Sequence, residues 1–167
     1  MKADDKSDLG GFHGAPWSTS LKLTSLFVSL VLIGVAIAVG RTGGWAGWLA
    51  SSASLSLLVG MLLFTVRGYA VEGSALVVRR LLWNTRLSLL GLVSAKADPL
   101  AMESSLRTFG NGGGFSFTGR YRNKRLGSYR ALVTDPARSV VLRWPERTVV
   151  VSRGSPEAFV RELLGRV

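Results

Sequence analysis

Six basic side chains are the residues of this sequence whose type and spacing suit a defined chemistry. They form two groups in the chain, which are Arg79 and Arg80, then Arg120, Arg122, Lys124 and Arg125. Arginine presents a planar fork of N–H donors that matches phosphate oxygens, and each basic residue near an anionic leaflet contributes about 1 kcal/mol of attraction. The pattern predicts a face that binds anionic lipid headgroups. The alternative is a solvated basic surface whose charge only fixes membrane topology.

Other chemistries require residues that the sequence lacks or scatters. It has no cysteine and one histidine, His13, so a metal site would depend on dispersed carboxylates. The glycines of Gly110–Gly114 suggest a phosphate loop, but Phe115 and Ser116 follow where that loop requires Lys and Ser or Thr. No Ser/His/Asp set and no pair of carboxylates can be assembled. We therefore predict no catalysis, cofactor or metal, and a mobile hairpin turn at the glycines.

Two uncharged runs determine where the basic residues are held. Leu23–Gly40 has eighteen residues and Trp48–Val66 has nineteen, none of them charged. As helices they would be about 27–29 Å long, close to the ~30 Å hydrocarbon core of a bilayer. A helix satisfies its own backbone hydrogen bonds, as lipid requires. The sequence predicts a transmembrane helical hairpin over 23–66, with Arg41–Gly47 as its turn.

The charge distribution orients this hairpin. From Arg67 onward there are 17 basic and 7 acidic residues, residues 1–22 are neutral overall, and Arg41 is the one charge between the two runs. Cytoplasmic flanks carry an excess of Lys and Arg. We therefore expect a two-span protein of the cell (inner) membrane, with the Arg41 turn outside and both flanks of the hairpin cytoplasmic.

Two alternatives compete with the hairpin. The runs could be buried helices of a soluble core, although no other stretch is able to cover two helices that are apolar on every face. The first run could also be a signal peptide, because Ala36-Ile37-Ala38 resembles a small-residue cleavage site. Against this, the region before the run is about twenty residues long and has no net charge, and the run exceeds the usual ~7–15 residues.

The flanking segments differ in pattern from the hairpin. Residues 1–22 are polar and rich in Gly and Asp, which predicts a disordered cytoplasmic tail. From Gly68 to Ser152, short β-rich runs separated by turn residues predict about seven antiparallel strands, with Ala75–Trp83 as one of them. Ser155 and Pro156 are typical of a helix start, and the apolar stripe that follows predicts an amphipathic helix that caps the sheet. The predicted class is α+β.

The segment 67–167 resembles the bacterial pleckstrin-homology (PH) domains that follow a pair of transmembrane helices. The matching stretches are GYAVE with LVVRR at the first hairpin, FGNGG, GRYRN and LGSY in the centre, and VVVS with SPEAF at the end. The resemblance implies a PH-like domain over 67–167. It carries over no ligand residues, because the family has none in common.

The resemblance implies a binding role, in keeping with the basic face. The first hypothesis is that the domain binds anionic lipid headgroups or a membrane partner. The second is a protein scaffold that uses a strand edge or the hairpin and has no lipid ligand. Nucleic-acid binding, suggested by the net charge of +11, is discounted because the aromatic residues of the Phe115–Tyr121 strand are predicted to face the core.

Overall fold

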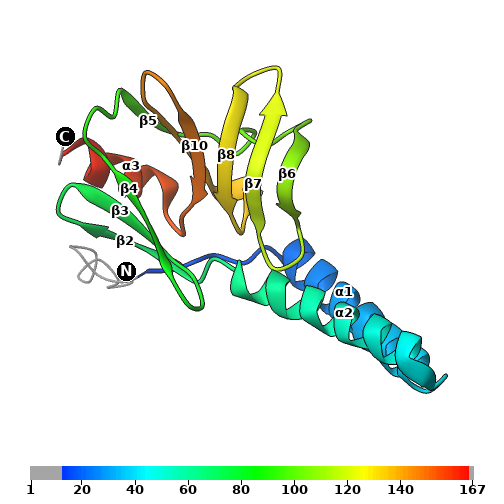
Figure 1. Ribbon diagram of the computed structural model, residues 1–167. Coiled ribbons are helices and arrows are strands. Elements are labelled where there is room, and N and C mark those ends of the chain that lie inside the picture. The colour runs from blue at the N-terminus through cyan, green and yellow to red at the C-terminus, as the bar shows by residue number, and fades with distance from the viewer. Residues whose placement is uncertain (1–12, 166–167) are drawn as a thin grey trace, which may run out of the picture.

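The computed structural model describes residues 13–165. Two long helices, α1 (Thr19–Gly40) and α2 (Gly44–Leu63), form a hairpin that projects from a strand-rich domain (Figure 1). Both helices begin earlier than predicted. The side chain of Ser18 accepts a hydrogen bond from the Leu21 N–H and so caps α1 at its start. The reversal between the helices needs only residues 41–43, because Gly43 adopts a left-handed φ of 71°.

The segment before the hairpin is attached to the domain. Residues 1–12 of the predicted tail lie outside the described residues, but β1 (His13–Gly14) pairs antiparallel with β2 and α1 starts at Thr19, so residues 13–22 differ from a disordered tail. The Ala15 N–H donates to the Arg67 carbonyl at 2.9 Å, and the Ser18 N–H donates to the Thr134 carbonyl at 3.4 Å. The hairpin is therefore connected to the domain where α1 begins as well as where α2 ends.

The domain contains two sheets. After the hairpin, the described residues form nine strands instead of about seven: β2 (Gly68–Glu72), β3 (Ala75–Arg79), β4 (Asn84–Ser88), β5 (Ser94–Ala97), β6 (Leu106–Gly112), β7 (Phe117–Asn123), β8 (Gly127–Val133), β9 (Ser139–Arg143) and β10 (Thr148–Ser152). One sheet has the order β1-β2-β3-β4 and the other β5-β9-β10-β8-β7-β6. All pairings are antiparallel except that β10 runs parallel to β8, which corrects the all-antiparallel prediction.

Two local differences from the predicted strands have physical causes. Strand β5 has the sequence SAKA, which is only four residues long and has no β-branched or aromatic residue, and it is held by backbone pairing with β9 from Ser94↔Arg143 to Ala97↔Val140. The predicted strand Ala75–Trp83 ends at Arg79, because the Arg80 N–H donates to the Trp83 carbonyl at 3.0 Å and closes a turn. Strands β9 and β10 form an antiparallel hairpin, from Ser139↔Ser152 to Arg143↔Thr148.

The main core lies between the two sheets and α3 (Pro156–Leu164). Its largest fully buried side chains include those of Tyr69, Leu132, Leu142, Phe159 and Leu163. Helix α3 lies against β5 and β9, with Ser155 at its N-cap position and Pro156 in its first turn. A second apolar cluster covers the other face of the six-stranded sheet beneath the β5–β6 connection. The α+β class is confirmed: a helical hairpin precedes a strand-rich domain that ends in a helix.

Candidate functional site

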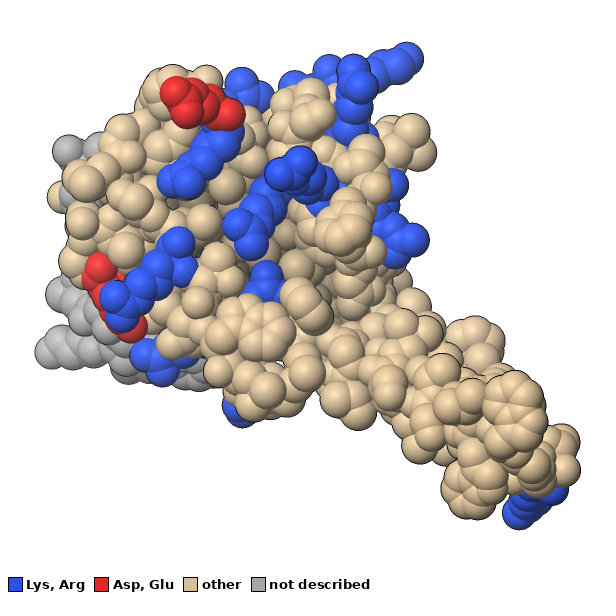
Figure 2. All heavy atoms as spheres, viewed as in Figure 1, with Lys and Arg blue, Asp and Glu red and all other residues tan. Residues whose placement is uncertain are grey.

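A cavity of about 760 Å³ lies where the end of α2 meets strands β6, β7 and β8. One side is apolar and comes chiefly from α2, through Leu57, Gly60, Met61 and Phe64. The other side is basic and comes from the strand-rich domain, through Arg80, Arg107, Arg120 and Arg130. Figure 2 shows basic side chains gathered over the domain above the base of the hairpin. The cavity therefore suits a ligand with one anionic end and one apolar end.

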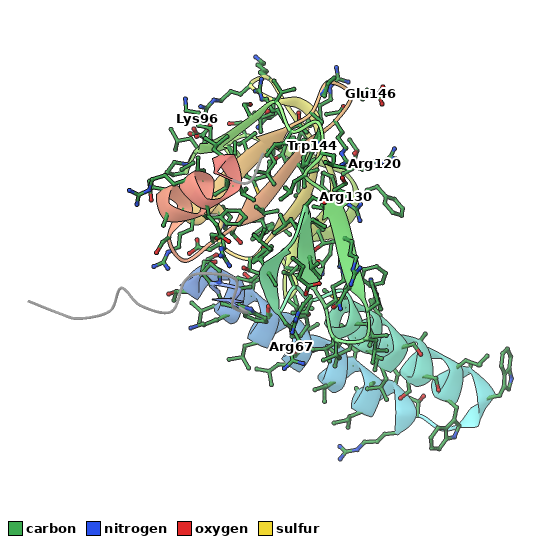
Figure 3. All side chains as sticks on the ribbon, turned by 90° about the vertical axis from the view of Figure 1, so that its left-hand side faces the viewer. Arg67, Lys96, Arg120, Arg130, Trp144 and Glu146 are labelled. Carbon is green, nitrogen blue, oxygen red and sulfur yellow. The ribbon has the colours of Figure 1, made fainter. Side chains whose placement is uncertain are left out.

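Two of these arginines are cross-strand neighbours. Arg120 on β7 pairs directly with Arg130 on β8, and both side chains extend on the same side of the sheet (Figure 3). Directly opposed residues have Cβ atoms about 4.5–5.5 Å apart, so like charges at such positions destabilise the sheet. An anion between the two guanidinium groups would remove this repulsion, which makes the pair a favourable place for phosphate oxygens.

The third arginine, Arg80, connects the cavity to the end of α2. Its Nη1 donates to the Phe64 carbonyl at 2.7 Å and its Nε donates to Thr85 Oγ1 at 3.3 Å. The guanidinium also lies over the rings of Phe64 and Trp83, at 5.7 and 5.9 Å from their centroids. The residue is only 6% exposed, and this burial, followed by the positive charge of Arg130, lowers the pKa of Arg80. An anion in the cavity would raise the pKa of Arg80 again, because its negative charge would stabilise the protonated guanidinium.

The charge of the cavity is not balanced by carboxylates within the described part of the chain. The ion pairs there use Arg79, Arg86, Arg125, Arg138 and Arg153. None of them includes Arg80, Arg107, Arg120 or Arg130. Arginines left without a carboxylate beside an apolar wall favour an external anion as their partner.

The glycine-rich stretch builds the end of the cavity nearest the hairpin. Residues Gly110–Gly112 belong to β6, and the turn that follows rests on the hairpin: the Phe115 N–H donates to Ser25 Oγ of α1 at 2.8 Å. The backbone of Gly114 lies against the end of the Met61 side chain, which would have to move aside for a β-carbon at this position. The turn was predicted to be mobile; it is instead seated on both helices. Strands on both sides also exclude a P-loop here.

The structure places the six predicted basic residues in different parts of the domain. Arg80 and Arg120 line the cavity, whereas Arg122 and Lys124 lie progressively farther along β7 and its turn. Strand β7 starts beside the hairpin, because Ser116 Oγ donates to the Phe64 carbonyl at 3.4 Å, and then runs away from it. At ~3.3 Å per residue, Lys124 lies about 13 Å beyond Arg120.

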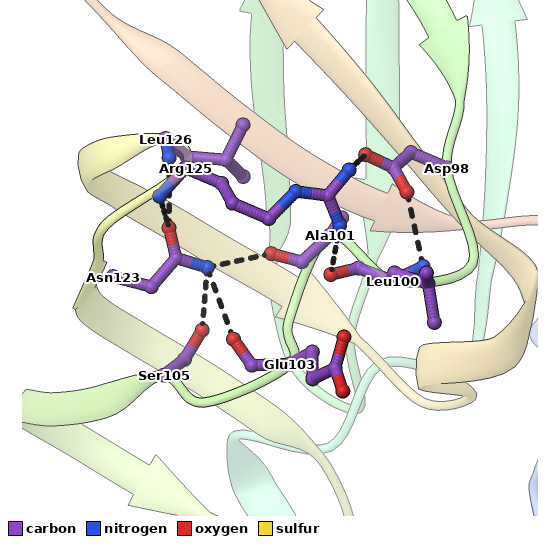
Figure 4. Close-up of polar contacts among 8 residues, drawn as sticks. All are labelled: Asp98, Leu100, Ala101, Glu103, Ser105, Asn123, Arg125 and Leu126. Atoms are coloured by element: carbon purple, nitrogen blue, oxygen red, sulfur yellow. Dashed lines mark hydrogen bonds and ion pairs between the residues drawn. The ribbon is translucent and has the colours of Figure 1, made fainter.

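Arg125 and Arg79 are engaged in contacts within the domain. Arg125 pairs with Asp98 at 3.0 Å and donates to the Leu100 carbonyl at 2.9 Å (Figure 4). Beside it, the Asn123 amide donates to the Ala101 carbonyl at 2.9 Å, so this group fastens the β5–β6 connection over the sheet. Arg79 pairs with Glu72 at 3.5 Å. Neither residue lines the cavity.

Two of the four cavity arginines, Arg107 and Arg130, were not among the predicted basic residues. Arg130 lies in an alternating strand, where Tyr129 and Ala131 face the second apolar cluster and Arg130 faces the opposite side. That alternation was visible in the sequence, but the pairing of Arg130 with Arg120 depends on the strand register. Arg107 lies on the edge strand β6 across a β-bulge, which interrupts the alternation that could have placed its side chain.

Tyr121, on the opposite face of β7, gives the domain an alkaline limit of stability. Burial raises its pKa from 10.0 to about 12, against the opposing charge of Arg107, and its hydroxyl donates to the Asn111 carbonyl at 2.6 Å. The folded state favours the neutral phenol of Tyr121. Its contribution to the free energy of unfolding is therefore complete below pH 10 and is lost as the pH rises through about 12. Chemical unfolding in detergent should show a steeper loss of stability over this range for the natural chain than for Tyr121→Phe. Equal slopes would contradict the assignment.

The described residues contain no group of three His, Cys, Asp or Glu side chains suited to a metal ion. A family model described as "Bacterial PH domain" matches residues 67–167, which is the segment that contains both sheets from β2 onward and helix α3. No curated protein and no solved structure matches the chain.

Proposed function

Because the chain belongs to the bacterial PH domain family, we propose that it is a non-enzymatic integral membrane protein that binds an anionic lipid headgroup in the cavity beside α2. The domain would lie on the cytoplasmic face of the cell membrane, held there by two spans. PH domains bind lipids or proteins, and the family assignment by itself does not choose between them. The shape and charge of the cavity are what favour a lipid over a protein.

The hairpin supports the membrane part of the proposal. Helices α1 and α2 have 22 and 20 residues, so they are about 33 and 30 Å long. Large apolar side chains project from them into open space: Leu30 is 61% exposed and Leu57 is 56% exposed. Helices of a soluble core would be covered by the rest of the chain, and these are not. A bilayer would cover them.

The ends of the hairpin support the orientation. Arg41 lies at the far tip, where Figure 2 shows basic atoms beyond a stretch of the hairpin whose visible face is uncharged, while Arg67 lies at its base (Figure 3). The larger basic surface is thus on the domain side, as cytoplasmic flanks require. Trp45 and Trp48 lie near the tip and Trp17 near the base, at the two levels where aromatic rings meet headgroups.

The observation that carries the lipid assignment is the meeting of four arginines with the apolar end of α2 in one cavity. A phospholipid phosphate would lie between Arg120 and Arg130 and within reach of Arg80. Its acyl chain would lie along Leu57 and Met61, parallel to a helix that is itself in lipid. A soluble anion would satisfy the arginines but leave the apolar wall uncovered.

A protein scaffold is the second candidate, favoured by strand β6. This strand is an edge of its sheet, and its Leu106 and Phe109 side chains are each 76% exposed. An exposed apolar edge is suited to the addition of a partner strand. Charge changes inside the cavity would not affect such a partner, which separates the two candidates.

The lipid assignment is tested on the full chain in detergent micelles. Native mass spectrometry would measure the apparent Kd for phosphatidylglycerol with the natural chain, with the double variant Arg120→Gln, Arg130→Gln, and with the matched double variant Arg122→Gln, Lys124→Gln. At about 1 kcal/mol or more per arginine, the first pair should weaken binding at least ~30-fold. The matched pair should change it by less than ~3-fold, since it lies outside the cavity.

Three results would overturn the assignment. Unchanged affinity in the Arg120/Arg130 variant would remove the cavity as the site. An equal loss in the Arg122/Lys124 variant would indicate general attraction to a basic surface. Complete competition by inorganic phosphate, with affinity equal to that of phosphatidylglycerol, would indicate a soluble anion as the ligand.

A further inference from the structure

The turn between β3 and β4 has an unusual composition for an exposed turn. Residues 80–83 have the sequence RLLW, and the turn is closed by the Arg80 N–H bond to the Trp83 carbonyl. Leu81 is 47% exposed, Leu82 is 72% exposed and Trp83 is 38% exposed. Turn tips ordinarily carry Gly, Pro, Asn, Asp or Ser, because these residues suit the backbone and the water around it. Three consecutive exposed apolar residues need another explanation.

The position of this turn relative to the hairpin supplies one. The Trp83 ring contacts the Phe64 ring edge-on, with centroids 5.0 Å apart and planes at 81°. Phe64 is the residue that follows α2, and its carbonyl accepts the Arg80 hydrogen bond. In Figure 1 the β3–β4 turn lies beside the base of the hairpin. The apolar tip is therefore level with the place where the uncharged surface of α2 ends.

We propose that Leu81, Leu82 and Trp83 insert into the boundary between headgroups and acyl chains of the leaflet that α2 leaves. This inference rests on the proposed membrane-spanning hairpin. The occupant is the bilayer, because Phe64 makes the apolar surface of the turn continuous with that of α2. A tryptophan is favoured at this depth, and Arg80 and Arg67 beside the turn carry the charge that anionic headgroups attract. Three side chains are also too few for a stable protein interface, which buries about 800 Å² per partner.

The test uses single cysteines, since the natural chain has none. Leu82→Cys would be labelled with the fluorophore nitrobenzoxadiazole in full-length protein reconstituted in phosphatidylcholine–phosphatidylglycerol vesicles. Leu90→Cys is the matched control, because Leu90 is 73% exposed and follows β4 at its opposite end. Leu30→Cys, in α1, reports whether the hairpin is in the bilayer. Each label would be exposed to lipid-attached spin-label quenchers and to a water-soluble quencher.

Insertion predicts that the label at 82 is quenched by shallow lipid-attached spin labels and shielded from the aqueous quencher. The label at 90 should show the reverse, and the label at 30 should be quenched by spin labels placed deep in the acyl chains. If position 82 is as accessible to water as position 90 while position 30 is shielded, the proposal that the turn inserts is wrong, but the proposal that the hairpin spans the membrane is retained. If position 30 is also accessible to water, both proposals fail.

Discussion

Replacing Gly119 with alanine should lower the free energy of unfolding by about 3–5 kcal/mol, because strain and overpacking add at this position. Gly119 has φ +143°, a conformation that L residues rarely adopt. A β-carbon there would overlap the Phe109 carbonyl oxygen on β6 and lie 2.8 Å from the α-carbon of Gly110. Strands β6 and β7 would have to move apart, and the wall of the cavity that they form would be distorted.

The measurement is denaturant unfolding of the full chain in detergent, followed by near-ultraviolet circular dichroism, together with phosphatidylglycerol binding. Gly154→Ala is the matched control, since nothing lies within 4 Å of its added β-carbon. The control should change stability by less than ~0.5 kcal/mol. An unfolding midpoint for Gly119→Ala equal to that of Gly154→Ala would show that the two strands do not approach as described.

Removing the Phe159 ring should also destabilise the domain by about 3–5 kcal/mol, the usual cost of deleting a buried aromatic side chain. Phe159 is 2% exposed and anchors α3 in the main core. The guanidinium of Arg153 lies 4.6 Å from its ring centroid, and that arginine is itself only 5% exposed. Phe159→Ala would therefore leave a cavity and also take away the aromatic face beneath a buried cation.

Leu164→Ala is the control for the same helix, because Leu164 is 53% exposed. It should cost less than ~1 kcal/mol in the same unfolding measurement. Similar losses in the two variants would mean that α3 does not bury Phe159 against the sheets. Both residues are apolar positions of α3, but the structure buries Phe159 against the core and leaves Leu164 exposed.

The hairpin, the strand-rich domain and the final helix could be predicted because each depends on local composition. Uncharged runs, β-rich runs and the Ser155-Pro156 start all lie within short windows of sequence. Strand β5 could not be predicted, because SAKA is short, contains no β-branched or aromatic residue, and is specified by its pairing with β9. The parallel pairing of β8 with β10 is likewise a property of the whole sheet.

The cavity could be predicted only in part, because its arginines come together through the fold and not through the sequence. Arg120, Arg122, Lys124 and Arg125 are neighbours in sequence, yet a strand extends too far per residue to keep them in one place. Arg120 instead meets Arg130 through register and Arg80 through the fold of the other sheet. The glycines of 110–114 are compatible with a mobile turn or a packed one, and only contacts with the hairpin, such as the Phe115 bond to Ser25, distinguish the two.

The pairing of β1 with β2 gives the hairpin a second attachment to the domain, in addition to the link at the end of α2. A domain joined to a helical hairpin by one linker can rotate about that linker, so its cavity would take many directions relative to the hairpin axis. Here the Ala15 bond to Arg67 and the Phe64 bond to Arg80 fasten both legs to the same body, and torsion about either one is opposed by the other. Two attachments therefore limit rotation of the domain, and the direction of the cavity mouth relative to the hairpin axis varies less than it would with one.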